Sequence, residues 1–253
     1  MKRLILAAVL LTAFHVWAQK PKSNGEREAL VAVQNATTAD DRLKAIDNVL
    51  TKYADTEFKA VLLSMALQTA QQKNDLVQVV NYAERILEVD PKNALAQVTI
   101  AFETARRIRE NDLDKEEQLA KAEKYADQAL ANAPTLAKPQ STIPDADWDV
   151  RKKEIMSQAH ETKGMVATIR KKKDVAVVEY KAAAEVTPNP DPATLVRLGQ
   201  AYMDAGQYDE AVASLDKAIA VPNVLPQVKT IAEQKKAEAL KKKAAAAPAP
   251  APK

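Results

Sequence analysis

The chain has 253 residues, of which 47% are hydrophobic, 28% charged and only 4% aromatic, and its formal net charge is +3. This composition is typical of a folded soluble protein, and the shortage of aromatic residues favours helices packed through small side chains over β-sheet. The absence of cysteine excludes disulfides, thiol-based sites and a lipid-modified cysteine. Two histidines and four glycines are too few for multi-histidine metal sites, phosphate-binding loops or dinucleotide fingerprints.

Residues 1–18 have the pattern of a secretory signal peptide. Lys2 and Arg3 form a charged start, an apolar run follows, and small residues precede a cleavage point between Ala18 and Gln19. An uncleaved membrane anchor is the alternative, although the apolar run is shorter than the roughly 20 residues that a spanning helix needs. Export without disulfides is common in bacterial periplasms, so we expect a periplasmic or secreted protein.

Helical periodicity and proline content divide the rest of the chain into six segments. We expect N-terminal helices at 19–57, repeated helix pairs at 58–134 and 148–223, a proline-rich loop at 135–147 between them, a capping helix at 224–243 and a disordered Ala/Pro tail at 244–253.

A short phrase recurs along the chain. YAERILEVDP at 82–91 and YADQALANAP at 125–134 align without a gap, and looser copies end at Pro188 and Pro222. The last two prolines are 34 residues apart, whereas the earlier intervals of 43 and 54 residues predict insertions.

The pattern is most specific near the end of the chain, at Leu195, Leu198, Gly199, Tyr202, Ala211, Leu215, Ala218 and Pro222. It resembles the tetratricopeptide repeat, which is 34 residues long. The resemblance implies an all-α protein, an α-solenoid of antiparallel helix pairs with about four to five repeats. It also implies a concave groove, lined by the first helix of each pair, that binds a peptide or helix of another protein.

Small residues at this spacing let helix backbones approach closely. We therefore give a structural role to Ala83, Ala126, Ala183, Gly199, Ala211 and Ala218, with tyrosines and Leu215 filling the space between them. Gly206 is expected to end the first helix of the last pair in a left-handed conformation.

Groove residues are carried over from the family pattern. On the best-matched repeat they are Arg197, Gln200, Met203 and Asp204, on the preceding repeat Glu161, Thr162 and Met165, and on the repeat that begins at Phe58 they are Ser64, Gln68, Gln71 and Gln72. One family subtype clamps a partner's terminal carboxylate with a lysine four residues before an arginine. Arg197 stands at the arginine position, but Ala193 replaces the lysine, so this mode is not expected.

Other residues have both a functional and a structural interpretation. His160 with Glu154 and Glu161 lacks the second nitrogen or sulfur donor that a transition-metal site needs. Asp145, Asp147 and Asp149 could bind a hard cation or complement a helix N-terminus. Basic runs at 151–153, 170–173 and 241–243 are solvated faces or, for the last run, a weak contact with an anionic envelope surface. Trp148 is either an anchor for the proline-rich loop or a partner contact.

We therefore predict a non-enzymatic protein–protein interaction scaffold of the bacterial cell envelope, without catalytic residues, cofactors, metal ions or nucleic-acid partners. The alternative is a structural or self-associating envelope protein attached to the wall or membrane through its basic Lys/Ala/Pro tail. The sequence does not identify the partner or the oligomeric state.

Overall fold

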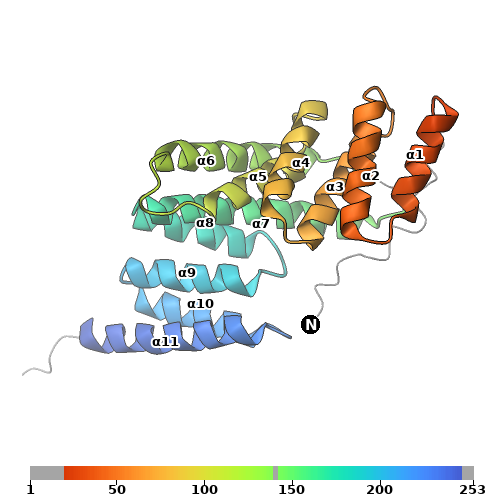
Figure 1. Ribbon diagram of the computed structural model, residues 1–253. Helices are drawn as coiled ribbons and strands as arrows, with labels where there is room; N and C mark the ends of the chain where they lie inside the picture. The colour runs from red at the N-terminus through yellow and green to blue at the C-terminus, as the bar shows by residue number, and fades with distance from the viewer. Residues whose placement is uncertain (1–19, 139–141, 247–253) are drawn as a thin grey trace, which may run out of the picture. The chain divides into compact units, whose positions relative to one another are not determined.

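The computed structural model describes residues 20–138 and 142–246 (Figure 1). Within these ranges the chain forms eleven α-helices, one short 3-10 helix and no strand. The predicted signal peptide at 1–18 and residues 247–253 of the expected tail lie outside the described residues. No helix in the described ranges has both the length and the apolar character needed to cross a membrane. The helices fall into two compact units, residues 1–99 and 100–253.

In the first unit, the first four helices form a stack in which successive helices pack against each other. The helices of this unit are α1 (Asn24–Asn35), α2 (Ala39–Lys52), α3 (Lys59–Gln72), α4 (Leu76–Val89) and the start of α5 (Ala94–Ala105). Ser23, Thr38 and Asp75 cap α1, α2 and α4, because each side chain accepts a hydrogen bond from a backbone N–H in the first turn of its helix.

In the second unit, successive helices from residue 115 onward also pack against each other, and the last helix packs in addition against the helix two places before it. The helices of this unit are the end of α5, α6 (Lys115–Asn132), the 3-10 helix η1 (Ala133–Thr135), α7 (Asp145–Ile169), α8 (Lys173–Glu185), α9 (Pro192–Asp204), α10 (Tyr208–Ala220) and α11 (Pro226–Ala246). The predicted all-α solenoid of antiparallel helix pairs is confirmed.

Small residues bring the helices of each pair close together. The five alanines predicted to do so are fully buried. A Cβ atom on Gly199 would lie 2.6 Å from Cγ of Leu215, and one on Gly164 would lie 2.7 Å from the ring of Tyr180. The backbones of α9 and α10, and of α7 and α8, therefore approach too closely for any side chain at these two positions.

Three turns between paired helices share one backbone geometry. Asn74, Lys171 and Gly206 have φ angles of 56°, 60° and 78°, so each ends its helix in the left-handed region. The N–H of the following residue bonds the carbonyl five residues earlier, at 2.8 to 3.0 Å, which is the Schellman arrangement. The prediction for Gly206 is confirmed, and the same turn recurs with asparagine and lysine.

Two segments are more helical than predicted. The loop expected at 135–147 ends at Pro144, because Asp145 and Asp147 form the first turn of α7, where acids complement the helix dipole. α11 continues to Ala246, into the expected tail, because alanine has the highest helix propensity. Trp148 anchors the loop, since its indole N–H donates to the carbonyl of Leu136 at 3.0 Å.

Candidate functional site

The face of α9 that the sequence singled out is only partly accessible. Asp204 is exposed, and Arg197 and Gln200 are half-buried. Met203 is not available to a partner, because it is buried in a cluster with Ala211 and Ala239. The prediction of Met203 as a groove residue is wrong because α11 covers this part of α9.

The corresponding face of α7 is closed as well. Thr162 is completely buried, and its hydroxyl donates to the carbonyl of Gln158 at 2.9 Å. Met165 is half-buried against two apolar clusters. Glu161 is buried and forms an ion pair with Arg197 of α9. Glu161 therefore joins two helices and Thr162 is enclosed within the fold, although both were predicted to face a partner.

Burial is electrostatically costly for the carboxylate of Glu161, and the ion pair with Arg197 offsets part of that cost. Burial raises the pKa of Glu161, and the positive charge of Arg197 opposes that rise without cancelling it. The guanidinium of Arg197 therefore favours the ionised form of Glu161 and is committed to a contact within the chain.

Gln200 is also engaged within the chain. Its amide oxygen accepts a hydrogen bond from Lys235 of α11 at 2.5 Å, and its amide nitrogen donates to Asp204 at 2.8 Å. Lys235 was not singled out from the sequence. The polar groups on the accessible part of α9 thus each have a partner within the chain.

The face of α3 is different, because it is open. Ser64 and Gln71 are exposed, Gln68 is half-buried, and the neighbouring Gln72 is exposed. The Ser64 hydroxyl donates to the carbonyl of Ala60 at 2.9 Å. None of the three glutamine side chains has a hydrogen-bond or ionic partner within the described part of the chain. All of the sequence-predicted residues on α3 therefore lie on one accessible helix face.

Comparisons with known proteins agree with this architecture. Residues 192–221, which cover α9 and α10, match the family model of the tetratricopeptide repeat. This segment is therefore similar to one tetratricopeptide repeat. No curated protein matches the sequence.

Solved structures of tetratricopeptide proteins have the same fold. The thermophilic TPR protein TTC0263 of Thermus thermophilus is similar with a TM-score of 0.52 and 15% identity, over 85% of this chain and 99% of that one. PilW, a widely conserved type IV pilus biogenesis factor, is similar with a TM-score of 0.56 and 17% identity, over 88% of this chain and 90% of that one. At this level of identity the likeness concerns the fold alone.

Polar bridges join successive tetratricopeptide-like repeats in both units. Their partners lie 33 to 36 residues apart, about one repeat length: Asp40 with Lys73, Asp47 with Tyr82, Glu161 with Arg197, Gln200 with Lys235, and Asp209 with Lys243. The spacing itself is a signal in the sequence, since complementary side chains one repeat apart fall on neighbouring helices. A search for such pairs would have shown that Arg197 and Glu161 bind each other.

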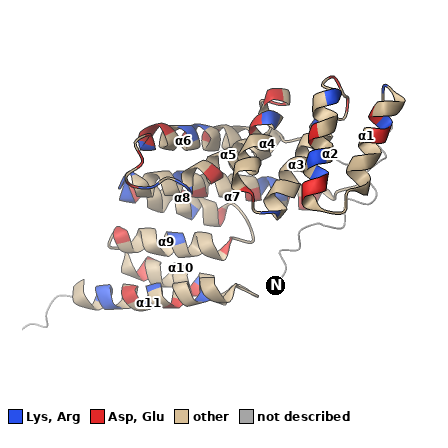
Figure 2. Ribbon diagram, viewed as in Figure 1, with Lys and Arg blue, Asp and Glu red and all other residues tan. Residues whose placement is uncertain are grey.

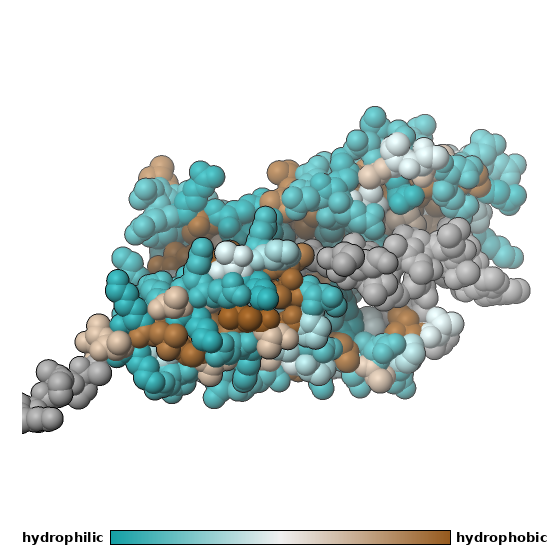
Figure 3. Space-filling model, turned by 90° about the horizontal axis from the view of Figure 1, so that it is seen from below, coloured by the Kyte–Doolittle hydropathy of each residue, from teal (hydrophilic) through white to brown (hydrophobic). Residues whose placement is uncertain are grey.

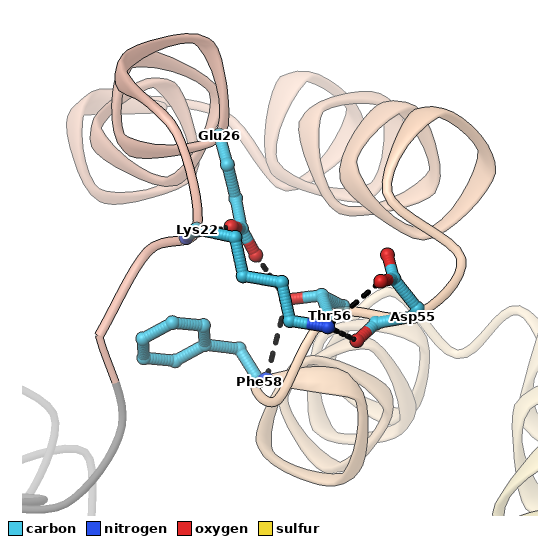
Figure 4. A network of polar contacts seen from close by, with 5 residues as sticks. All are labelled: Lys22, Glu26, Asp55, Thr56 and Phe58. Carbon is cyan, nitrogen blue, oxygen red and sulfur yellow. Dashed lines mark hydrogen bonds and ion pairs between the residues drawn. The ribbon is translucent and has the colours of Figure 1, made fainter.

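A polar network holds the N-terminal segment onto the first unit (Figure 4). The carboxylate of Glu26, which is buried, accepts hydrogen bonds from the hydroxyl of Thr56 at 2.6 Å and from the backbone N–H of Lys22 at 2.5 Å. The Lys22 ammonium donates to the carbonyl and the carboxylate of Asp55, both at 2.7 Å. Thr56 Oγ1 in turn accepts from the N–H of Phe58 at 3.2 Å. The network therefore links α1 to the turn before α3 and stabilises this part of the fold.

His160 belongs to a second network that joins three helices. Its Nδ1 lies 2.7 Å from Glu179 of α8, and Lys163 lies 3.2 Å from Glu179 and 2.9 Å from Asp127 of α6. Burial favours the neutral form of Glu179, but His160 and Lys163 hold its pKa below the usual range. No three histidine or acidic side chains in the described ranges are placed to hold a metal ion.

Proposed function

We propose that this chain is a non-enzymatic protein–protein interaction scaffold, exported to the bacterial cell envelope, that binds a segment of a partner protein on an accessible first-helix face. The observation that carries the proposal is the open face of α3 in a tetratricopeptide fold, where glutamine side chains are exposed and unpaired. Amide groups without a partner in the described part of the chain can hydrogen-bond another protein, and the helix that carries them is already ordered. The use of the same fold by PilW, a type IV pilus biogenesis factor, is compatible with an envelope role.

Attachment through the basic C-terminal segment is less well supported. α11 contains six lysines. Four of them, Lys235, Lys236, Lys242 and Lys243, bond to Gln200, Asp216, Glu238 and Asp209. The three contacts with carboxylates reduce the positive charge available to an anionic surface. The face shown in Figure 3 is mainly hydrophilic, with separate hydrophobic patches, and exposed apolar side chains near the C-terminus are Leu225, just before α11, and Ile231 and Leu240 within it.

Affinity capture from bacterial envelope extract tests the proposal. The chain without residues 1–18 should retain a discrete protein, and the triple variant Gln68→Ala, Gln71→Ala, Gln72→Ala should lose it while keeping its helical circular dichroism. Retention of the same proteins by both forms, or of none by either, would overturn the proposal. A second form lacking residues 244–253 should keep the partner, whereas a protein held through its tail would lose it.

A further inference from the structure

Leu113 is the most exposed large apolar side chain in the described ranges. It is 107% exposed, whereas the next in order, Val77, is 70% exposed. Leu113 lies in the connection between α5 and α6, within the second unit. A side chain this exposed contacts no apolar surface of its own chain, so its burial energy is still available to a contact with another molecule.

The connection between α5 and α6 holds Leu113 in a defined position. Ile108, at its start, packs against a buried apolar cluster of α5, α6 and α7. The backbone N–H of Arg109 donates to the carboxylate of Asp112 at 2.7 Å, and the N–H of Lys115 donates to the Asp112 carbonyl at 3.2 Å. Because the turn is already ordered, binding through its apolar tip loses little conformational entropy.

A hollow of about 310 Å³ opens between α8 and α10 of the same unit. Its apolar lining comes mainly from α9, with Leu195, Leu198 and Tyr202, and from Pro190 before that helix. Ligand sites range from roughly 300 to 1,000 Å³, so this hollow is at the small end. It therefore suits one or two apolar side chains better than a whole helix.

The rim of the hollow carries charges of both signs. Lys181 and Glu185 of α8 stand on one side, and Glu210 and Lys217 of α10 on the other. Lys181 and Glu185 are both exposed and 3.8 Å apart, which makes a weak ion pair. Glu210 and Lys217 have no hydrogen-bond or ionic partner within the described residues. An occupant can therefore pair with cations and anions on this rim.

The charges around Leu113 complement that rim. Asp112 and Asp114 flank the leucine, and Arg109 precedes it by four residues. The acidic residues of this connection and of the start of α6 appear red at the left end of α6 in Figure 2. With the leucine in the apolar part of the hollow, the aspartates match the two lysines and the arginine matches a glutamate. Since Leu113 is fully exposed in its own chain, these features can meet only between two copies.

We propose that Leu113 of one copy inserts into the hollow between α8 and α10 of a second copy, so that the chain assembles with itself. The contact joins two different surfaces, so it either continues into an open chain or closes into a ring. A single small contact of this kind gives weak association. The inference goes beyond the proposed function, because neither surface includes α3.

Analytical ultracentrifugation of the chain without residues 1–18 tests the inference. The weight-average mass should rise between about 10 µM and about 1 mM protein, as weak association requires. Leu113→Asp should lower the association constant at least about tenfold, because the leucine is no longer buried and a charge enters the apolar hollow. The matched control Val77→Asp also removes an exposed apolar side chain, and it should associate as the parent does.

Mixing two variants identifies the two surfaces. Ala213→Glu places a larger, negatively charged side chain in the lining of the hollow, where it opposes the aspartates beside Leu113 and should also weaken self-association. A mixture of Leu113→Asp with Ala213→Glu should form a one-to-one complex, because the first variant keeps the hollow and the second keeps the leucine.

Three results would overturn the inference: a parent chain that stays monomeric at about 1 mM, undiminished association of Leu113→Asp, or a mixture of the two variants that forms no complex. The variant Gln68→Ala, Gln71→Ala, Gln72→Ala should self-associate as the parent does. Loss of an envelope partner and loss of self-association are therefore separate results, so the proposed function and this inference can fail independently.

Discussion

Replacing Arg197 with methionine should destabilise the protein by removing the ion pair that joins α9 to α7. The side chain of Glu161 is 9% exposed and that of Arg197 is 38% exposed, so the substitution leaves a buried carboxylate without its cation. Removing one partner of a fully buried pair costs roughly 3–5 kcal/mol, and because water already screens part of this pair we expect about 2–4 kcal/mol. Urea unfolding followed by far-UV circular dichroism measures the loss.

The loss should depend on pH in a defined direction. The pKa of Glu161 is already raised by burial in spite of Arg197, and removing the cation raises it further. A carboxyl whose pKa is higher in the folded than in the unfolded state takes up a proton on folding. The free energy of unfolding of the protein therefore falls as pH rises from the ordinary carboxyl pKa of about 4.3 through the raised pKa of Glu161. The deficit of Arg197→Met should be larger at about pH 7 than at about pH 4.5.

Two controls separate this effect from a general loss of charge. Arg151 pairs with Glu154 on the same helix, but both side chains are about half exposed, so Arg151→Met should cost no more than about 0.5 kcal/mol at any pH. The double variant Glu161→Gln with Arg197→Met should be more stable than Arg197→Met alone at neutral pH, because no buried charge remains. A cost for Arg197→Met equal to that of Arg151→Met, or independent of pH, would refute the reasoning.

Three further substitutions test the packing and the turns by chemical denaturation. Gly199→Ala should cost about 1–3 kcal/mol, because its Cβ would lie 2.6 Å from Leu215, and adding Leu215→Ala should cost less than the sum of the two single changes. Lys171→Gly should stabilise the chain by about 1 kcal/mol, because lysine is strained at a φ of 60°. Gly206→Ala should destabilise it by a similar amount, because alanine is strained at a φ of 78° in a position that is otherwise open. Equal signs for the two turn substitutions would contradict this account.

The fold was largely predictable because the repeat imposes local requirements on residue size. Gly199 and Ala211 had to be small where helices of a pair meet, and both are buried. The extent of α7 was harder to predict. Pro139 and Pro144 indicated a loop, yet the acids that follow begin the helix immediately after Pro144, because their negative charge complements the N-terminal end.

The candidate site was predictable only in part. The position of a residue in the family pattern does not show whether its side chain already has a hydrogen-bond or ionic partner within the chain. The position of Arg197 in the repeat indicated the groove side of α9, but its state depends on Glu161, one repeat earlier in the sequence. Met203 was expected to be accessible because it stands at a groove position of the family pattern, and its burial against Ala239 requires the packing of α11. On α3 no neighbour among the described residues supplies such a partner, so the glutamines are accessible as expected.

The residues that join repeats differ from the exposed glutamines of α3, so substitutions in the two sets should have different effects. Changes at Glu161 or Arg197 alter the contact between repeats, so they act on stability whatever the partner is. Changes at Gln68 or Gln71 touch no polar side-chain contact in the described part of the chain, and glutamine and alanine are both good helix formers. Under the proposed function, binding and stability depend on different residues, and a variant of α3 that loses its partner should still unfold at the parent's urea concentration.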